Sequence, residues 1–356
     1  MKIDAYSHIL PARYFERMRE LAVDPKALKR WLELPALHDL DARLSMMDEF
    51  GDGYQQVLTL SSPPIELLAG PAESPALARL ANETMRELCD EHPDRFPAFV
   101  ASLPMNNPDA SLDEIAFAID GLGASGVQVF TNVNGRPLDD PDFAGVFDEM
   151  ARRDLPIWMH PARGAGFADY TTEQSSKYEI WWALGWPYET SAAMARLVFS
   201  GLFDRHPGIS IVTHHMGAMI PYLEGRIGLG WSDQFGSRTD GEEYGRLRQG
   251  LAERPLEYFR RFYADTALSG SDIGTRCGLD FFGVDHVLFG TDCPFDPEGG
   301  PMYVRETIRV IDGLDITEAE REQIYHGNLR RLIGRAAGDA EARHGRYPRR
   351  ALTTNP

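Results

Sequence analysis

Short apolar runs rich in β-branched residues alternate along the chain with longer segments that repeat an apolar residue every three or four positions. A short continuous apolar run is typical of a buried strand, whereas the longer repeat is typical of a helix with one apolar face. The predicted strands are residues 2–6, 54–60, 96–103, 126–130, 156–160, 209–214, 261–267 and 286–290. Eight strands separated by helices predict an α/β fold, specifically a (β/α)8 TIM barrel.

Polar residues give the predicted helices their start signals. Thr317 is followed three positions later by Glu320, which predicts a capping box. Ser74 stands directly before a proline, and Ser111 and Thr190 precede apolar repeats. We therefore expect each of these three residues to open the helix that follows it.

Three of the predicted connections from strand to helix are long, namely residues 9–53, 161–189 and 215–260. In barrels, the connections that follow the strands form the catalytic face, so we expect these long βα loops to shape a binding site. No internal repeat interrupts the alternation of elements. We expect a single domain over residues 1–335, followed by a polar C-terminal tail at 336–356.

The chain is acidic, with 54 Asp and Glu against 36 Lys and Arg and a formal net charge of −18. Nucleic-acid binding needs a basic face, so this charge argues against a nucleic-acid partner. The sequence contains neither an uninterrupted apolar segment long enough to span a membrane nor the pattern of a signal or transit peptide. We expect a cytoplasmic protein without a membrane partner.

Side chains that can bind a metal stand at or just beyond the carboxyl ends of four predicted strands: Tyr6, His8, His160, His214, His215 and Asp292. Because the carboxyl ends of barrel strands converge on one rim, we expect these side chains to meet. Imidazole and carboxylate donors suit zinc, manganese or iron, and a site with an open position is typical of catalysis. The pattern predicts a divalent metal ion at this rim.

Several longer motifs identify a family. They are KIDAYSHILP at the start, WMHP, GWPYETSAAMARLVFSGLFDRHPGISIVTHHMGAMIPYLEGRI, FGTDCPFDPEGG and IYHGNLRRLI. Through these motifs residues 1–335 resemble the amidohydrolase superfamily, in the branch of aminocarboxymuconate-semialdehyde decarboxylase and the resorcylate decarboxylases. The resemblance implies a TIM barrel, a metal-dependent enzyme and a small carboxylic acid as substrate.

The resemblance also implies roles for single residues. The family's His-x-His or Glu-x-His pair on strand one falls on Tyr6 and His8, and its ligands on strands five and eight fall on His160 and Asp292. The catalytic histidine of strand six, which precedes a glycine and a proline, falls on His215. Tyr6, His8, His160 and Asp292 are therefore the expected metal ligands, and His215 and Asp292 are the expected catalytic residues.

The chain departs from the family's pattern at Tyr6, where the family has His or Glu. A nearby cation favours the phenolate form of tyrosine, but its free pKa of about 10 makes it a poorer ligand than imidazole at neutral pH. Three interpretations stay open. Tyr6 binds a metal such as Fe(III), manganese or zinc; or it hydrogen-bonds around a weaker site; or the chain is a non-catalytic partner subunit of a paralogous enzyme.

Further polar residues could reach the same rim. Arg163 follows WMHP closely and is placed to bind a substrate carboxylate in a bidentate manner, although a surface position fits equally well. His214, Asp265, Glu179 and Glu189 are candidates for a second metal or for contacts around the first. Loop or structural roles are the alternative for the carboxylates.

Two reactions fit one metal ion. In non-oxidative decarboxylation, Asp292 or His215 delivers a proton to the carbon that loses CO2; in hydrolysis, Asp292 takes a proton from a bound water and His215 polarises the scissile carbonyl. The resemblance favours the decarboxylase. An alternative on the same fold is a dinuclear non-haem Fe or Fe/Mn monooxygenase, which needs two metals. The aromatic segment 178–188 predicts a pocket wall or a subunit contact, in a homodimer or a hetero-oligomer with a paralogue.

Overall fold

The computed structural model describes residues 1–21, 29–238, 244–245, 247 and 250–334. Parallel strands form its centre: β1 Lys2–Ile9, β2 Tyr54–Leu60, β3 Ala98–Phe99, β4 Ala101–Ser102, β5 Val127–Phe130, β8 Ile157–His160, β9 Ile211–Thr213, β10 Tyr263–Asp265 and β11 Val287–Leu288. Each lies within a run predicted as a strand or overlaps it, and β3 and β4 are two parts of one predicted strand. The predicted tail at 336–356 lies outside the described residues.

The strands close into a barrel. One sheet has the order β1-β2-β3 and a second has the order β4-β5-β8-β9-β10-β11, with every pairing parallel. A bridge between Ser7 and Cys293, with a hydrogen bond of 2.8 Å from His8 N to Cys293 O, joins the chain beyond β11 to β1. This ring is the predicted (β/α)8 arrangement, and it brings the carboxyl ends of all the strands to one rim.

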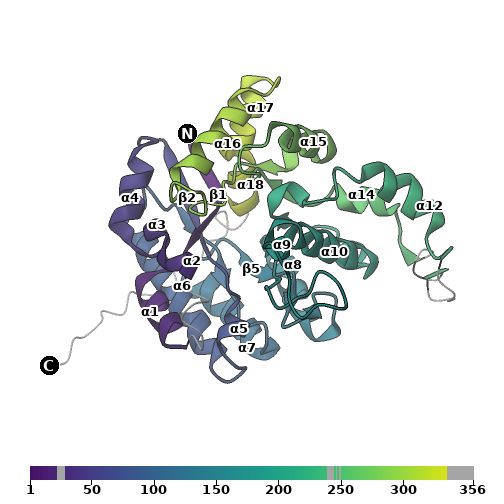
Figure 1. Cartoon of the computed structure of the whole chain (residues 1–356), viewed down its shortest axis with the longest axis horizontal. Helices are drawn as coiled ribbons and strands as arrows, with labels where there is room; N and C mark the ends of the chain where they lie inside the picture. The colour runs from purple at the N-terminus through teal and green to yellow at the C-terminus, as the bar shows by residue number, and fades with distance from the viewer. Residues whose placement is uncertain (22–28, 239–243, 246, 248–249, 335–356) are drawn as a thin grey trace.

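Helices surround the strands, and the segment that carries α12 and α14 projects to one side (Figure 1). The α-helices are α1 Ala12–Leu21, α2 Lys29–Leu32, α3 Pro35–His38, α4 Leu40–Asp48, α5 Ile65–Leu68, α6 Ser74–Glu91, α7 Pro108–Ala116, α8 Ala144–Arg153, α9 Ile180–Ala183, α10 Gly185–Phe199, α11 Leu202–Arg205, α12 Ser232–Gln234, α14 Pro255–Phe259, α15 Asp272–Phe282, α16 Pro301–Asp312, α17 Glu318–Glu322 and α18 Asn328–Gly334. A short hairpin, β6 Asn132–Val133 and β7 Arg136–Pro137, follows β5. Within the described part of the chain, no helix is both long and apolar enough to cross a membrane.

Two apolar clusters hold the layers together. One cluster takes members from strands all around the barrel: Ile3, Ala5, Tyr6, Val57, Ala98, Val100, Trp158, Val212, Tyr263 and Leu288. The larger cluster packs the strands against the surrounding helices. Burial of apolar area in these two layers is the main force that fixes the barrel, and the rim above them is left to polar side chains.

The predicted helix starts are partly confirmed. Thr317 caps α17 in the expected capping box. The caps expected at Ser111 and Thr190 are wrong, because α7 already begins at Pro108 behind Asn107 and α10 begins at Gly185. The Ser111 hydroxyl instead donates to the backbone carbonyls of Asn107, four residues earlier, and of Pro104 ahead of the helix. Short polar side chains offer such local alternatives to capping.

Glu66 gives a prediction about stability and pH. It is buried after β2, its Oε1 has no hydrogen-bond partner among the described residues, and burial raises its pKa to about 7. Between about pH 4.5 and 7 the unfolded chain therefore loses this proton while the folded chain keeps it, so the cost to stability grows with pH and is complete above pH 7. We expect Glu66→Gln to stabilise the protein by roughly 3 kcal/mol at pH 8 and hardly at pH 4. Urea unfolding at both pH values measures this.

The exposed Glu73 in the same segment offers a matched control. Glu73→Gln should leave the free energy of unfolding within roughly 0.5 kcal/mol at both pH values. A stabilisation by Glu66→Gln of the same size at pH 4 and pH 8 would contradict the raised pKa.

Candidate metal centre

A change of register in β1 sets the direction of the first two candidate residues. The pairing of β1 with β2 shifts between Asp4 and Ser7, and such irregularities re-aim side chains next to functional sites. As a result both Tyr6 and His8 are completely buried at the rim and lie close together, with 5.3 Å between their ring centroids.

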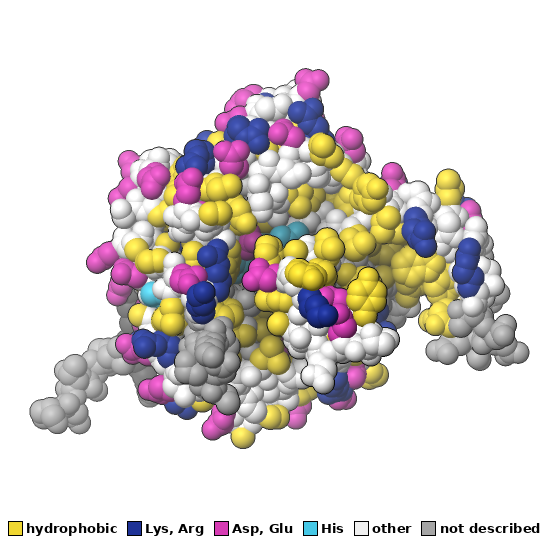
Figure 2. Space-filling view, in the orientation of Figure 1, with side chains coloured by type: hydrophobic (Ala, Val, Ile, Leu, Met, Phe, Trp, Pro, Cys, Tyr) yellow, Lys and Arg dark blue, Asp and Glu magenta, His cyan; other side chains and the backbone are white. Residues whose placement is uncertain are grey.

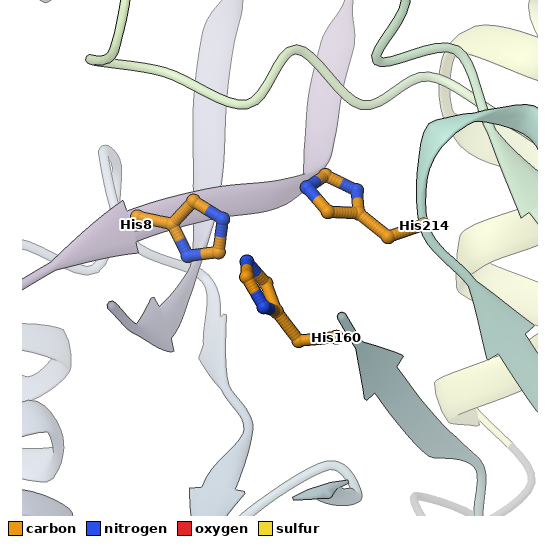
Figure 3. Close-up of side chains that lie close together, drawn as sticks. All are labelled: His8, His160 and His214. Carbon is orange, nitrogen blue, oxygen red and sulfur yellow. The ribbon is translucent and has the colours of Figure 1, made fainter. Parts of the chain in front are cut away.

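Three histidines from three strands meet at this rim. One ring nitrogen from each of His8, His160 and His214 lies within 4.8 Å of the others. Figure 3 shows the three rings turned toward one another, from β1, from the end of β8 and from the residue after β9. His8 and His160 were expected here as ligands, whereas His214 was expected only around the metal or at a second one.

Hydrogen bonds fix the rings of His8 and His160. The Nδ1–H of His160 donates to the carbonyl of Pro161 at 2.7 Å. Nδ1 of His8 lies 3.2 Å from Thr59 Oγ1, whose own hydrogen goes to the carbonyl of Ser7, so that Nδ1–H is the donor. In both rings Nε2 is therefore left with its lone pair, the state in which histidine binds a metal.

Asp265 at the end of β10 fixes His214 and the turn behind it. Its Oδ2 accepts a short hydrogen bond from Nδ1–H of His214, and its Oδ1 accepts from the backbone N–H of His215 at 2.9 Å and of Ala267 at 3.0 Å. Burial lowers the pKa of His214, but Asp265 and Asp292 outweigh burial and raise it to about 10. From the sequence, Asp265 was a candidate for a second metal or for contacts around the first. The structure shows it in contact with the imidazole of His214.

Asp292 connects two groups of side chains. Its Oδ1 lies 3.2 Å from His8 Nε2 and 3.4 Å from His214 Nε2, and its Oδ2 lies 3.6 Å from His215 Nε2. Burial would raise the pKa of Asp292, but its contacts with the surrounding histidines, His214 first, hold the pKa well below its ordinary value. The carboxylate is therefore ionised, with one oxygen toward the histidine cluster and one toward His215.

His215 stands on an unusual turn. His215, Met216, Gly217 and Ala218 all have positive φ, between 55° and 71°, directly after β9. Non-glycine residues in this region are uncommon and cluster at functional sites, where the surrounding structure holds them. The Nδ1 of His215 has no hydrogen-bond partner among the described residues, which sets it apart from the other three histidines of the rim.

Tyr6 lies against His214. Their rings stack with 4.0 Å between centroids and 20° between planes. Within the described chain the buried phenol oxygen of Tyr6 has no hydrogen-bond partner, and burial, with Asp265 and Asp292 nearby, raises its pKa well above its usual value. The sequence-based expectation that Tyr6 binds the metal stays a prediction.

The remaining candidates lie farther out. Arg163 Nη1 pairs with Glu189 Oε1 at 2.9 Å, so each of these two charges has a partner. Glu179 is exposed, and its Oε2 accepts a hydrogen bond from Trp182 Nε1 at 3.0 Å. In the described chain neither glutamate belongs to the two groups of side chains with metal-binding spacing, which are His8, His160, His214 and His214, His215, Asp292.

Aromatic rings line the histidine cluster. Phe295 lies 5.6 Å from the His8 ring, and Phe130 and Trp186 lie 5.1 and 5.6 Å from the His160 ring, measured between centroids. Figure 2 shows histidine atoms in a hollow at the centre of this face, with hydrophobic side chains gathered beside it. A flat apolar ligand with a polar group directed at the histidines fits such surroundings.

Sequence reasoning missed Arg43 on α4. This fully buried guanidinium donates to the carbonyl of His8 at 2.6 Å, to Ser7 Oγ at 2.5 Å and to Gln56 Oε1 at 2.9 Å. It therefore holds the backbone that carries a candidate ligand. No local motif marks it in the sequence, because its partners come from β1 and β2.

The donor set fits a divalent metal ion. His8 Nε2 is buried without a hydrogen-bond partner in the described chain, and Asp292 Oδ1 is 3.2 Å from it but outside hydrogen-bonding geometry. Ligand atoms of a tetrahedral zinc site are separated by roughly 3.3 Å, given Zn–N bonds of about 2.0 Å. The spacing, the free lone pairs and one carboxylate are what such an ion requires.

The chain is similar to proteins of known family and activity. The amidohydrolase family model matches residues 3–335. Gamma-resorcylate decarboxylase of Rhodococcus jostii is 31% identical, over 85% of this chain and 90% of that protein. The 2-amino-3-carboxymuconate-6-semialdehyde decarboxylase of Dictyostelium discoideum is 26% identical, over 94% and 92%. A crystal structure of dihydroxybenzoic acid decarboxylase from Polaromonas, with bound manganese and the inhibitor 2-nitroresorcinol, is 25% identical with a TM-score of 0.73, over 94% and 96%.

These matches confirm the predicted resemblance and the predicted barrel. The three named proteins are decarboxylases, and one of them holds manganese, which supports a divalent metal ion. They lend no support to the monooxygenase alternative or to iron.

Proposed function

The chain belongs to the amidohydrolase family, and on this premise we propose that it is a metal-dependent decarboxylase that removes CO2 without oxidation from a small aromatic carboxylic acid. The observation that carries the proposal is the position of Asp292 between the buried histidine cluster and His215. Two relatives that align over 90% and 92% of their own length act, by their names, on gamma-resorcylate and on 2-amino-3-carboxymuconate-6-semialdehyde. A hydroxylated benzoate is the substrate class that we favour.

His8, His160 and Asp292 would hold the metal ion, and Tyr6 stays a predicted fourth donor. The bound ion supplies positive charge that orients the carboxylate and a neighbouring oxygen of the substrate and stabilises charge that develops there. Manganese or zinc suits this donor set, and manganese has the support of the Polaromonas structure.

The reaction breaks the bond between the carboxyl carbon and the ring carbon. CO2 leaves, the bonding electron pair stays on the ring carbon, and this carbon takes up a proton. We assign the delivery of that proton to His215 and Asp292, whose Nε2 and Oδ2 are 3.6 Å apart. The aromatic rings of Phe295, Phe130 and Trp186 exclude water and accommodate the flat substrate.

Arg163 keeps its predicted role in binding substrate only if its pairing with Glu189 can be exchanged for a pairing with the substrate carboxylate. Both side chains are 19% exposed, so the pair lies at an accessible edge. We propose that Arg163 acts at the entrance.

The proposed activity predicts that manganese-loaded protein releases CO2 from at least one member of a panel of 2,6-dihydroxybenzoate, 5-carboxyvanillate and 6-methylsalicylate. Removal of the metal with a chelator should lower the rate by at least roughly 100-fold, and added Mn²⁺ should restore it. Benzoate, which lacks the neighbouring hydroxyl, is the control and should not react. Fully loaded protein that releases CO2 from no panel member would contradict the proposal.

Assembly stays a prediction. Tyr178, Trp182 and Tyr188 are 91, 44 and 57% exposed in the segment expected to form a pocket wall or a subunit contact. We propose that this segment lies in a homodimer interface, because large exposed aromatic side chains favour protein contacts. The cytoplasmic location expected from the sequence also stays a prediction.

A further inference from the structure

We infer that His214 is a direct ligand of the metal ion, together with His8, His160 and Asp292, and that Tyr6 packs against its ring instead of binding the metal. The inference rests on the proposed function, since it concerns the same ion. It changes the expected ligand set at two positions, His214 and Tyr6.

His214 is anchored in the same way as the two expected histidine ligands. In His8, His160 and His214 alike, Nδ1–H donates to a protein oxygen, respectively from Thr59, Pro161 and Asp265. Such a partner behind the ring is the regular companion of a metal-binding imidazole, because it fixes the tautomer and aims the other nitrogen. His215 lacks this partner in the described chain. By this criterion His214 belongs with the expected ligands His8 and His160, and His215 does not.

His8 and His214 approach the same oxygen of Asp292. His8 Nε2 and His214 Nε2 lie 3.2 and 3.4 Å from the same oxygen, Asp292 Oδ1. These separations match the roughly 3.3 Å between ligand atoms around a tetrahedral ion. His160 completes the group, with the three ring nitrogens within 4.8 Å of one another. Asp292 lies outside this group of three, in a second group that shares His214 with it, so binding of all four donors to one ion requires the side chains to move together.

A rival interpretation makes His214 a permanent cation between Asp265 and Asp292. Its contact to Asp265 is short, as a charged hydrogen bond would be. The contact from Nε2 to Asp292 Oδ1, however, is 3.4 Å, whereas charged N–H···O bonds are typically about 2.8 Å. The second contact is therefore a weak hydrogen bond, and a metal ion that binds Nε2 would displace its proton.

The stacking of Tyr6 argues against its phenol oxygen as the other donor. The Nε2 lone pair of His214, which would hold a metal ion, lies in the plane of the imidazole. The Tyr6 ring lies beside this plane, at 4.0 Å between centroids and 20° between planes. The phenol oxygen is part of the Tyr6 ring and so belongs to the neighbouring layer. Tyr6 thus supports the imidazole from one side.

The test uses the full chain loaded with Co²⁺ and proton NMR in water. Each cobalt-bound imidazole with a protected Nδ1–H gives one exchangeable resonance that is strongly shifted by the metal. We expect three such resonances, from His8, His160 and His214, and two after His214→Gln, a change that keeps a hydrogen-bond donor near Asp292. Chelator competition should show that Co²⁺ binds roughly 100-fold more weakly in His214→Gln, and 10–100-fold more weakly in Asp265→Asn.

Tyr6→Phe and His215→Gln are the matched controls, and both should retain three shifted resonances. Two resonances in the unmodified protein, or a loss of Co²⁺ affinity in Tyr6→Phe as large as in His214→Gln, would overturn the inference but leave the proposed decarboxylase intact. Three resonances without release of CO2 from any substrate would support the ligand set and contradict the proposed reaction. Because the unmodified protein is decisive by itself, the result does not depend on whether a variant folds.

Discussion

Asp292→Asn is expected to lower kcat for decarboxylation by roughly 10³-fold or more and to weaken metal binding at the same time. The carboxylate touches the histidine cluster through Oδ1 and His215 through Oδ2, so one substitution removes a ligand charge and half of the pair that delivers the proton. Loss of a proton-transfer group alone costs roughly 10²–10⁴-fold. Metal content per chain by mass spectrometry and single-turnover rates measure the two effects.

Glu298 offers a control on the same loop, since it is exposed and pairs with Arg305. Glu298→Gln should keep the metal content and rate of the parent protein. If Asp292→Asn also keeps the parent's metal content, the assignment of Asp292 as a ligand is wrong, whatever happens to the rate.

Arg43→Met is expected to destabilise the protein by roughly 3–5 kcal/mol, the range for removing one partner of a buried charged network. The guanidinium is fully buried, and burial lowers its pKa. It stays paired through hydrogen bonds to His8 O, Ser7 Oγ and Gln56 Oε1, which the substitution would leave without this donor. Because β1 carries His8, we also expect weaker metal binding. Chemical unfolding with and without metal measures both effects.

Two variants calibrate this result. Arg43→Lys keeps the charge but not the planar group of donors, and should lose about half as much stability. Arg17 pairs with Glu20 on the surface. Arg17→Ala should lower the free energy of unfolding by less than roughly 1 kcal/mol. An Arg43→Met protein as stable as its parent would show that the buried hydrogen bonds contribute nothing net.

The local pattern of apolar residues was sufficient to predict the strands and most of the residues at the rim. The runs at 54–60 and 156–160 coincide closely with β2 and β8, because strands buried on both faces are rich in apolar residues. Given eight such strands in a closed parallel barrel, chain geometry alone places residues after each strand on one rim. His8, His160 and Asp292 follow from that rule without any knowledge of contacts.

Helix starts show where the local signal fails. Ser111 and Thr190 have the right chemistry for caps, but Asn107 and the turn at Gly185 come first and the helices run through both residues. Several polar residues near a helix start compete for the same backbone N–H groups, and packing of the helix against the barrel decides among them. This choice is not encoded in the spacing of one motif.

The sequence by itself determined the barrel, the rim and the kind of atoms found there. Only the family resemblance singled out His215 as the expected catalytic residue, and the sequence left open which partners orient the adjacent rings of His214 and His215. Only the tertiary structure decided this, because the hydrogen-bond partner of His214 is Asp265 from a different strand, and the backbone of His8 is held by Arg43 from a helix. Orientation of a ring depends on partners that are distant along the chain, whereas convergence of strand ends depends only on local periodicity and closure of the sheet.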